Sequence, residues 1–198
     1  MADFLANWSG RGPEPQRALR PSTTSSGATT KRGDMADWRG DRVQAAIDGR
    51  NPTVLAELYA SFAVIGDVQF LPGYALALTK LPGIDRLSDL PRPDRVQYLA
   101  DVDLVATAVE SVCSARDSGY RRVNVEVLGN ADAFLHAHIW PRYEWEPADI
   151  VGKPVWLYPA ERWRDPATAL GPDHDGLRAA LTSEVDRLRD SVEFRFNV

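Results

Sequence analysis

The chain has 198 residues, 44% of them hydrophobic, which is enough to bury one core, and its formal net charge is −5. The negative charge and the absence of a basic stripe argue against nucleic-acid binding. The single cysteine, Cys113, excludes an internal disulfide and fits a reducing cytoplasm. No apolar run approaches the ~20 residues that span a bilayer, and no signal-peptide pattern is present. We therefore expect a cytoplasmic protein that does not associate with membranes.

Residues 1–34 are rich in Ser, Thr, Gly, Pro and Arg and have no apolar periodicity. Such a segment cannot offset its ordering entropy by burying apolar surface. We predict a disordered tail over residues 1–34 and a single domain with a carboxyl-terminal extension over residues 35–198.

The domain is expected to begin with helices and a hairpin. Between Asp41 and Ala60 the pattern favours two short helices, the second capped by Asn51 and opened by Pro52. Two β-rich runs follow, residues 62–68 and 74–80, and a turn containing Pro and Gly joins them. This arrangement predicts a β-hairpin.

A long helix is predicted over Pro93–Arg116, followed by a strand over Tyr120–Leu128. The helix carries apolar residues at three- and four-residue spacing, and the strand alternates valines with polar residues. The proposed helix stripe consists of Val96, Leu99, Val102, Val105, Val109 and Val112.

The segment Asn130–Arg142 reads N-A-D-A-F-L-H-A-H-I-W-P-R and holds two of the three histidines of the chain. Alternate side chains of a strand share a face, so His136 and His138 should point one way and the aliphatic residues between them the other. Pro141 lacks a backbone donor and is expected to close the strand. Arg142 would then lie just beyond it, where it can meet an anion.

Three interpretations of the two histidines remain open at this point. The first is a partly exposed strand with incidental imidazoles. The second is a metal site, but zinc needs three or four ligands, and the chain offers only the distant His174, the single Cys113 and Asp132 nearby. The third is nucleophilic or acid–base chemistry by one imidazole. Asn130 and Arg142 favour the third interpretation, because both side chains suit phosphate groups.

The remaining sequence predicts a covering layer and a final helix. Aromatic residues between Tyr143 and Trp163 show no clear period, and we assign them to the core or to an interface. Asp173 is expected to cap a last helix whose apolar stripe runs from Leu177 to Val192. Strands that come in hairpins imply an antiparallel sheet of about five strands and an α+β fold, packed with the long helix and the final helix.

Two separated segments carry a resemblance to a known family. The pattern G-N-x-x-x-x-L-H-x-H-x-x-P-R over Gly129–Arg142 resembles the active-site strand of the histidine triad (HIT) family, whose signature is H-x-H-x-H. The segment Phe62–Lys80 resembles the nucleoside-binding hairpin of that family. Both segments occur in the family's order. The form of the first motif resembles the dinucleoside polyphosphate hydrolase branch.

The resemblance has two departures. Phe134 stands in the place of the first triad histidine, and Tyr74 stands where a histidine often follows P-G. By position, His136 matches the nucleophilic histidine and His138 matches the last one. The family's nucleophile donates its other ring N–H to the main-chain carbonyl of the first triad position. Phe134 retains that carbonyl.

The resemblance also assigns roles outside the two histidines. The residue in the place of Asp67 binds ribose, and a carboxylate accepts two hydrogen bonds well. Ile65, together with Phe62 and Leu76, is a candidate for the base pocket. Asn130 is expected to contact a phosphate as a catalytic residue, and Phe134 and Arg142 are further candidates for substrate contacts.

The activity implied by the resemblance is hydrolysis or nucleotidyl transfer at the α-phosphate of a dinucleoside polyphosphate such as diadenosine tetraphosphate, through a nucleotidyl-histidine on His136. Hydrolysis of a nucleoside phosphoramidate is the close alternative. Nucleotide binding with little turnover is another, because of Phe134. No cofactor is required; a divalent metal is possible but unsupported by the sequence. The expected partners are a small nucleotide and a second copy of the chain, since many family members are homodimers.

Overall fold

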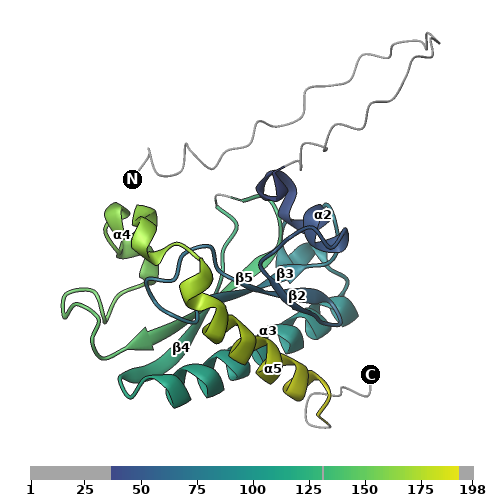
Figure 1. The fold of residues 1–198 in the computed structure, drawn as a ribbon. Helices are drawn as coiled ribbons and strands as arrows, with labels where there is room; N and C mark the ends of the chain where they lie inside the picture. The colour runs from purple at the N-terminus through teal and green to yellow at the C-terminus, as the bar shows by residue number, and fades with distance from the viewer. Residues whose placement is uncertain (1–36, 131, 192–198) are drawn as a thin grey trace, which may run out of the picture.

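The computed structural model describes residues 37–130 and 132–191. Their strands form one five-stranded antiparallel sheet in the order β1-β2-β3-β5-β4 (Figure 1). This is the predicted α+β architecture. The strands are β1 (Val54–Glu57), β2 (Ser61–Ile65), β3 (Ala75–Thr79), β4 (Tyr120–Val127) and β5 (His136–Tyr143).

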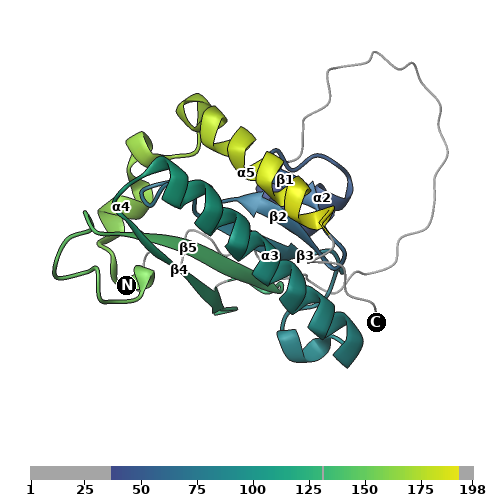
Figure 2. The ribbon, with the colours of Figure 1, turned by 90° about the horizontal axis from the view of Figure 1, so that it is seen from below.

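Two long helices, α3 and α5, pack against each other on one face of this sheet (Figure 2). The predicted long helix and final helix are both confirmed. No helix within the described ranges is long and apolar enough to cross a membrane. The helical segments are η1 (Trp38–Asp41), α2 (Arg42–Ile47), η2 (Leu87–Asp89), α3 (Arg92–Arg116), η3 (Val155–Leu157), α4 (Ala160–Arg164), η4 (Pro166–Thr168), η5 (Pro172–His174) and α5 (Asp175–Arg189).

The main core lies between the sheet and α3 and α5. Leu135, Ala137 and Ile139 point into it, as the alternation around the histidines predicts. The apolar stripe predicted for α3 is only partly buried, because Val96 and Leu99 are 47% and 43% exposed. In the first turns of α3 the core contact is made by Tyr98, which is fully buried.

The opposite face of the sheet is covered by shorter segments. Side chains of α2 pack on Phe62, Val64 and Leu78 there. Towards the other end of the same face, an aromatic cluster surrounds Trp140. The two faces therefore differ in composition, and the histidines of β5 share the second face.

One predicted helix is wrong. Residues 54–57 form the edge strand β1, which pairs antiparallel with β2. Asn51 does not cap a helix; its side-chain oxygen accepts hydrogen bonds from the backbone N–H and the hydroxyl of Thr53, a local turn that leads the chain into β1. Pairing with β2 decides the conformation here, because strand formation depends on neighbours more than on local propensity.

Three other boundaries differ from the sequence analysis. Pro141 does not end β5, which continues to Tyr143; β3 pairs only up to Ile139, so at Pro141 the strand has one neighbour and tolerates a missing donor. The helix α5 begins at Asp175 with His174 as its N-cap, not Asp173. The predicted tail over residues 1–34, and Val192 in the predicted helix stripe, lie outside the described residues.

Candidate active site

The two histidines of β5 lie side by side on the face opposite α3. His136 and His138 are 4% and 8% exposed, and their ring centroids are 4.6 Å apart with the rings nearly perpendicular. Buried imidazoles need hydrogen-bond partners, because an unsatisfied polar group inside a protein costs about 1–3 kcal/mol. The partners that the fold provides define the chemistry of each ring.

His136 is bonded as the family resemblance predicts. Its Nδ1 lies 2.8 Å from the carbonyl oxygen of Phe134. A carbonyl oxygen can only accept, so Nδ1 carries the proton and Nε2 keeps a free lone pair. Burial lowers the pKa of His136 below its usual value of 6.5, and the ring is neutral at pH 7. His136 is therefore held in the tautomer that a nucleophile requires.

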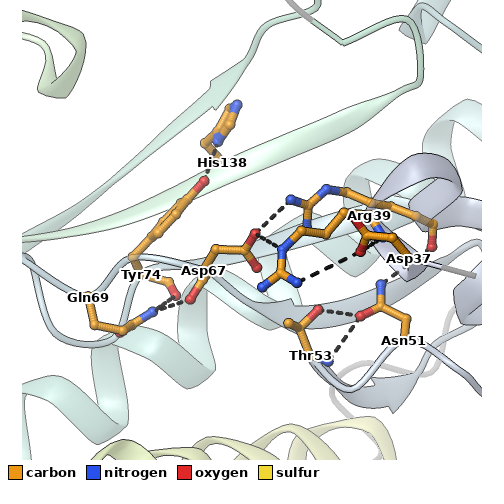
Figure 3. Close-up of polar contacts among 10 residues, drawn as sticks. Asp37, Arg39, Asn51, Thr53, Asp67, Gln69, Tyr74 and His138 are labelled. Carbon is orange, nitrogen blue, oxygen red and sulfur yellow. Dashed lines mark hydrogen bonds and ion pairs between the residues drawn. The ribbon is translucent and has the colours of Figure 1, made fainter. Parts of the chain in front are cut away.

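His138 is held by a tyrosine. The hydroxyl of Tyr74 lies 2.8 Å from Nδ1 of His138. Figure 3 shows the two side chains pointing toward each other. Burial raises the pKa of Tyr74 well above 10, so the hydroxyl keeps its proton, and donating to Nδ1 satisfies it. Burial, with a contribution from His136, lowers the pKa of His138 to about 3. In this arrangement the ring proton of His138 is on Nε2, where it can donate to an anionic oxygen.

Aromatic side chains close this face from solvent. The ring of Tyr74 stacks on Trp140, with centroids 3.5 Å apart. The Trp156 ring stands edge-on to His138 at 4.8 Å, and its Nε1 donates to Glu126 on β4 at 2.7 Å. Trp156 is the side chain from the carboxyl-terminal extension that covers the histidines. Both imidazoles are therefore almost fully buried in this arrangement.

Arg42, at the start of α2, brings a positive charge to the site. Its Nη2 lies 2.6 Å from Oδ2 of Asp67, and Nε of Arg39 lies 3.6 Å from the same oxygen. In Figure 3 the side chain of Asp67 lies between Tyr74 and Arg39. After burial and the bond to Phe134, the charge of Arg42 is the next influence on the pKa of His136. The sequence analysis missed Arg42, because it lies in a helix outside both motifs and no local pattern marks it.

Asp67 combines an ion pair with access to a pocket. Its Oδ2 is engaged by the two arginines, and within the described part of the chain its Oδ1 has no hydrogen bond. The carboxylate borders a pocket of about 270 Å³ that also contacts Trp38 and Thr53. The predicted ribose contact of Asp67 therefore remains a prediction, and Oδ1 is the oxygen that would make it.

Two predicted substrate contacts are wrong. Ile65 is 1% exposed and packs in the core beside α3, on the face away from the histidines. Phe62 and Leu76, the other candidates for the base pocket, lie on the histidine face. Because side chains of a strand alternate, a shift of one residue along β2 decides which of them faces a ligand.

The second wrong contact is Arg142, which anchors the loop after β5 and does not meet an anion from solvent. Its Nε and Nη2 donate to the buried carboxylate of Glu146, and its Nη1 and Nη2 donate to backbone carbonyls of residues 150–153. The hydroxyl of Tyr158 also donates to Glu146. These bonds commit Arg142 to a structural role.

The connection between β4 and β5 carries the remaining candidates. Asn130 is exposed, and its neighbour, residue 131, lies outside the described residues. Asp132 is half-buried; burial raises its pKa to about 6 against the opposing effect of Arg42. Among the residues that the structure describes, no group of three or more His, Cys, Asp and Glu side chains is arranged to hold a metal ion.

The sheet, the long helix on one face and the imidazoles on the other define the class of fold: it is that of histidine triad proteins. Crystal structures of histidine triad proteins from Marinobacter aquaeolei VT8 and Bradyrhizobium japonicum both match at 20% identity and a TM-score of 0.55. These matches cover 68% and 67% of this chain and 89% of each crystallised chain. A HIT protein from Sinorhizobium meliloti 1021 matches at 18% identity and 0.54, covering 70% and 93% of the two chains.

A hypothetical histidine triad nucleotide-binding protein from Sulfolobus tokodaii strain 7 matches at 15% identity with a TM-score of 0.53. This match covers 76% of this chain and 95% of that one. No protein-family model and no curated protein matches the sequence. The similarity is one of fold, and the chemistry must be argued from the side chains of this chain.

Proposed function

We propose that this protein is a nucleotide hydrolase or nucleotidyl transferase that acts at the α-phosphate of a dinucleoside polyphosphate such as diadenosine tetraphosphate. One observation carries the proposal. The 2.8 Å bond between Nδ1 of His136 and the carbonyl oxygen of Phe134 leaves Nε2 of a neutral, buried imidazole as a free nucleophile.

The reaction has two steps. The Nε2 lone pair of His136 attacks the α-phosphorus, and the bond to the leaving oxygen breaks with its electron pair remaining on that oxygen. Water then attacks the same phosphorus and loses a proton to the solvent. The N–P bond breaks with its electron pair returning to Nε2, so a nucleoside monophosphate is released and the imidazole is neutral again. No separate base is needed for the first step, because the attacking nitrogen carries no proton.

Charge on the phosphate oxygens is stabilised by groups already at the site. His138 offers Nε2–H when Tyr74 donates to its Nδ1, and the guanidinium of Arg42, which is ion-paired with Asp67, adds positive charge nearby. Asn130 remains a candidate phosphate ligand from the adjacent loop. Arg42 thus takes the cationic role that the sequence analysis gave to Arg142.

The nucleoside end is assigned to the pocket beside Asp67. Trp38 borders this pocket and provides an aromatic surface for a base, while Oδ1 of Asp67 can accept from a ribose hydroxyl. The guanidinium groups of Arg39 and Arg42 lie 4.3 and 4.9 Å from the ring centroid of Trp38 and fix its position.

Nucleotide binding with little turnover is the second candidate. Its support is the burial of His136 together with Phe134 at the first triad position, where the ring stands 4.9 Å from the imidazole. Hydrolysis of a nucleoside phosphoramidate uses the same nucleophile with a smaller leaving group and is the alternative reaction.

A homodimer is part of the proposal. Val96 and Leu99 on α3 and Val125 and Val127 on β4 are exposed apolar side chains. Val125 and Val127 pair with Ile139 and Ala137, so they lie on the face of the sheet that α3 covers. An apolar area of this kind at a sheet edge favours contact with a second copy.

The test is to incubate the protein with diadenosine tetraphosphate and with adenosine phosphoramidate, and to measure AMP release beside nucleotide affinity. We expect His136→Gln to lose AMP release and the covalent adenylyl adduct in an alkaline-quenched digest. His138→Asn should keep a slower reaction, and Arg92→Ala, an exposed change on α3, should resemble the wild type. If the wild type bound nucleotide without releasing AMP, the second candidate, a nucleotide-binding protein with little turnover, would replace the hydrolase.

A further inference from the structure

A second pocket, here called the β4 pocket, lies between β4 and the loop that follows β5. It has a volume of about 350 Å³. Strand β4 contributes Arg122, Asn124 and Glu126, and the loop contributes Gly152 and Lys153. All of these residues lie outside the two segments that resemble HIT motifs.

The β4 pocket opens on the face that carries the histidines. Glu126 is the cross-strand neighbour of His138, and Asn124 is that of Trp140. Directly opposite residues in an antiparallel pair have Cα atoms about 4.5–5.5 Å apart and project to the same side. The pocket therefore begins one strand away from the candidate active site.

The cations of the pocket are not all neutralised. Arg121 pairs with Glu144 at 3.0 Å, and Arg142 pairs with Glu146. Within the described ranges, the side chains of Arg122 and Lys153 have neither an ion pair nor a hydrogen bond. Among the described residues, these two cations outnumber the one carboxylate of the pocket without an ion pair, that of Glu126, and this excess of positive charge creates a local preference for an anion in a chain of net charge −5.

The carboxylate in the pocket is tied to the covering layer. Oε2 of Glu126 accepts from Nε1 of Trp156, whose ring stands over His138. Trp156 therefore connects a carboxylate of the β4 pocket with the ring of His138.

We propose that the β4 pocket binds the polyphosphate of the leaving half of the substrate, with Arg122 and Lys153 as its ligands. The inference rests on the proposed function and names its substrate class: a nucleotide with several phosphates beyond the scissile bond. A guanidinium binds phosphate oxygens through paired N–H groups and an ammonium acts as a point charge. The pocket of about 270 Å³ beside Asp67 would then bind one nucleoside of the dinucleotide, and the β4 pocket would bind the phosphates of the other half.

The experiment measures binding of inorganic tripolyphosphate by calorimetry, which does not depend on turnover. We expect the double variant Arg122→Ala with Lys153→Ala to bind tripolyphosphate at least ~10-fold more weakly, with AMP affinity unchanged. The matched control is Arg50→Ala with Arg92→Ala, which removes two exposed cations far from the pocket and should bind like the wild type. Arg122→Lys should retain most of the affinity.

A kinetic measurement links the pocket to the reaction. In the same double variant the KM for diadenosine tetraphosphate should rise by ~10-fold, while that for adenosine phosphoramidate, which has no leaving polyphosphate, should not change. Equal tripolyphosphate affinity in wild type and double variant, no binding to the wild type, or an equal loss in the control variant would each overturn the inference. If AMP release is absent but tripolyphosphate binding still depends on Arg122 and Lys153, the pocket stands and only the proposed reaction fails.

Discussion

The two faces of the sheet differ in what their side chains do. Towards α3 and α5, β5 presents Ala137 and Ile139 to a core of aliphatic residues. Towards the other side, the same strand presents His136 and His138 to aromatic rings, a tyrosine hydroxyl and a main-chain carbonyl. One face of β5 thus stabilises the fold by burying aliphatic side chains. The other face holds two imidazoles whose burial removes them from water, which is unfavourable for polar groups.

The difference shows how this fold tolerates buried polar groups. Each imidazole nitrogen that faces the protein has a partner, so the desolvation of the ring is partly compensated. Two ion pairs also lie on this side, Arg42 with Asp67 and Arg142 with Glu146. Changes on the aliphatic face should therefore alter stability, and changes on the histidine face should alter activity, with Arg142 as an informative exception.

The largest expected effect is on the histidine face. Replacing His136 with Gln removes the nucleophile but leaves a residue of similar volume, so AMP release should fall by ~10³-fold or more with a small change in stability. Rates of AMP release and thermal midpoints, measured on the same preparations, check this. A variant with near wild-type turnover would assign the chemistry to another side chain.

Arg142 lies on the histidine face, but we expect its replacement to alter stability. Arg142→Ala leaves the Glu146 carboxylate buried without its partner, which should lower the free energy of unfolding by about 3–5 kcal/mol. The double change Arg142→Met with Glu146→Gln should recover much of this loss. Urea unfolding measures both. If Arg142→Ala were stable but bound nucleotide weakly, the residue would be a ligand and not an anchor.

Ile139 tests the aliphatic face. The side chain is fully buried, and Ile139→Ala should lower the free energy of unfolding by about 2–4 kcal/mol through lost burial and a cavity. Turnover per folded molecule should stay within a few-fold of the wild type. A loss of turnover without a loss of stability would show that the two faces are not separable.

The pH dependence of stability follows from His138. Its pKa is about 3 in the folded state and near 6.5 when unfolded, so as the pH falls from 7 the unfolded state takes up the proton first. The wild type should lose about 2 kcal/mol more unfolding free energy between pH 7 and pH 5 than His138→Asn, which lacks this group. Urea titrations at the two pH values measure the difference. Equal losses in both proteins would mean that burial does not lower the pKa of His138 in the folded state.

The smallest expected effect is that of Tyr74. Tyr74→Phe keeps the stack on Trp140 and removes only the hydroxyl that fixes His138, so we expect a loss of about 1 kcal/mol in stability. The rate of AMP release should fall several-fold, because His138 can then carry its proton on either nitrogen. Combining Tyr74→Phe with His138→Asn should lower the rate of AMP release little further than His138→Asn alone. Additive losses would mean that Tyr74 does not act through His138.

Much of the fold is encoded in local patterns that the sequence reveals. The hairpin, the long helix, the final helix and the alternation of β5 follow from periodicity and turn residues. Residues 54–57 could not be assigned in this way, because β1 is a short edge strand whose conformation depends on β2. The contact between His136 and the Phe134 carbonyl was predicted from the resemblance to the HIT family, because a main-chain carbonyl is kept whatever side chain stands at that position.

The charged part of the site was less predictable. Arg142 is close to the histidine motif in sequence, but its guanidinium is bonded to Glu146. Arg42 is far from the motif in sequence, but its guanidinium contacts Asp67 at the site. Which arginine meets a ligand depends on tertiary packing, and no spacing rule encodes that. The same holds for Trp156, which crosses to His138 from the extension.

The stack of Trp156 on Trp163, with centroids 5.1 Å apart, gives the protein an intrinsic optical reporter. Both rings also approach Trp140, so three of the six tryptophans share one environment next to the imidazoles. Displacement of Trp156 by an incoming molecule must change the emission of this group. Entry to the histidines can therefore be followed by fluorescence on the unlabelled chain, in real time and before any bond is broken.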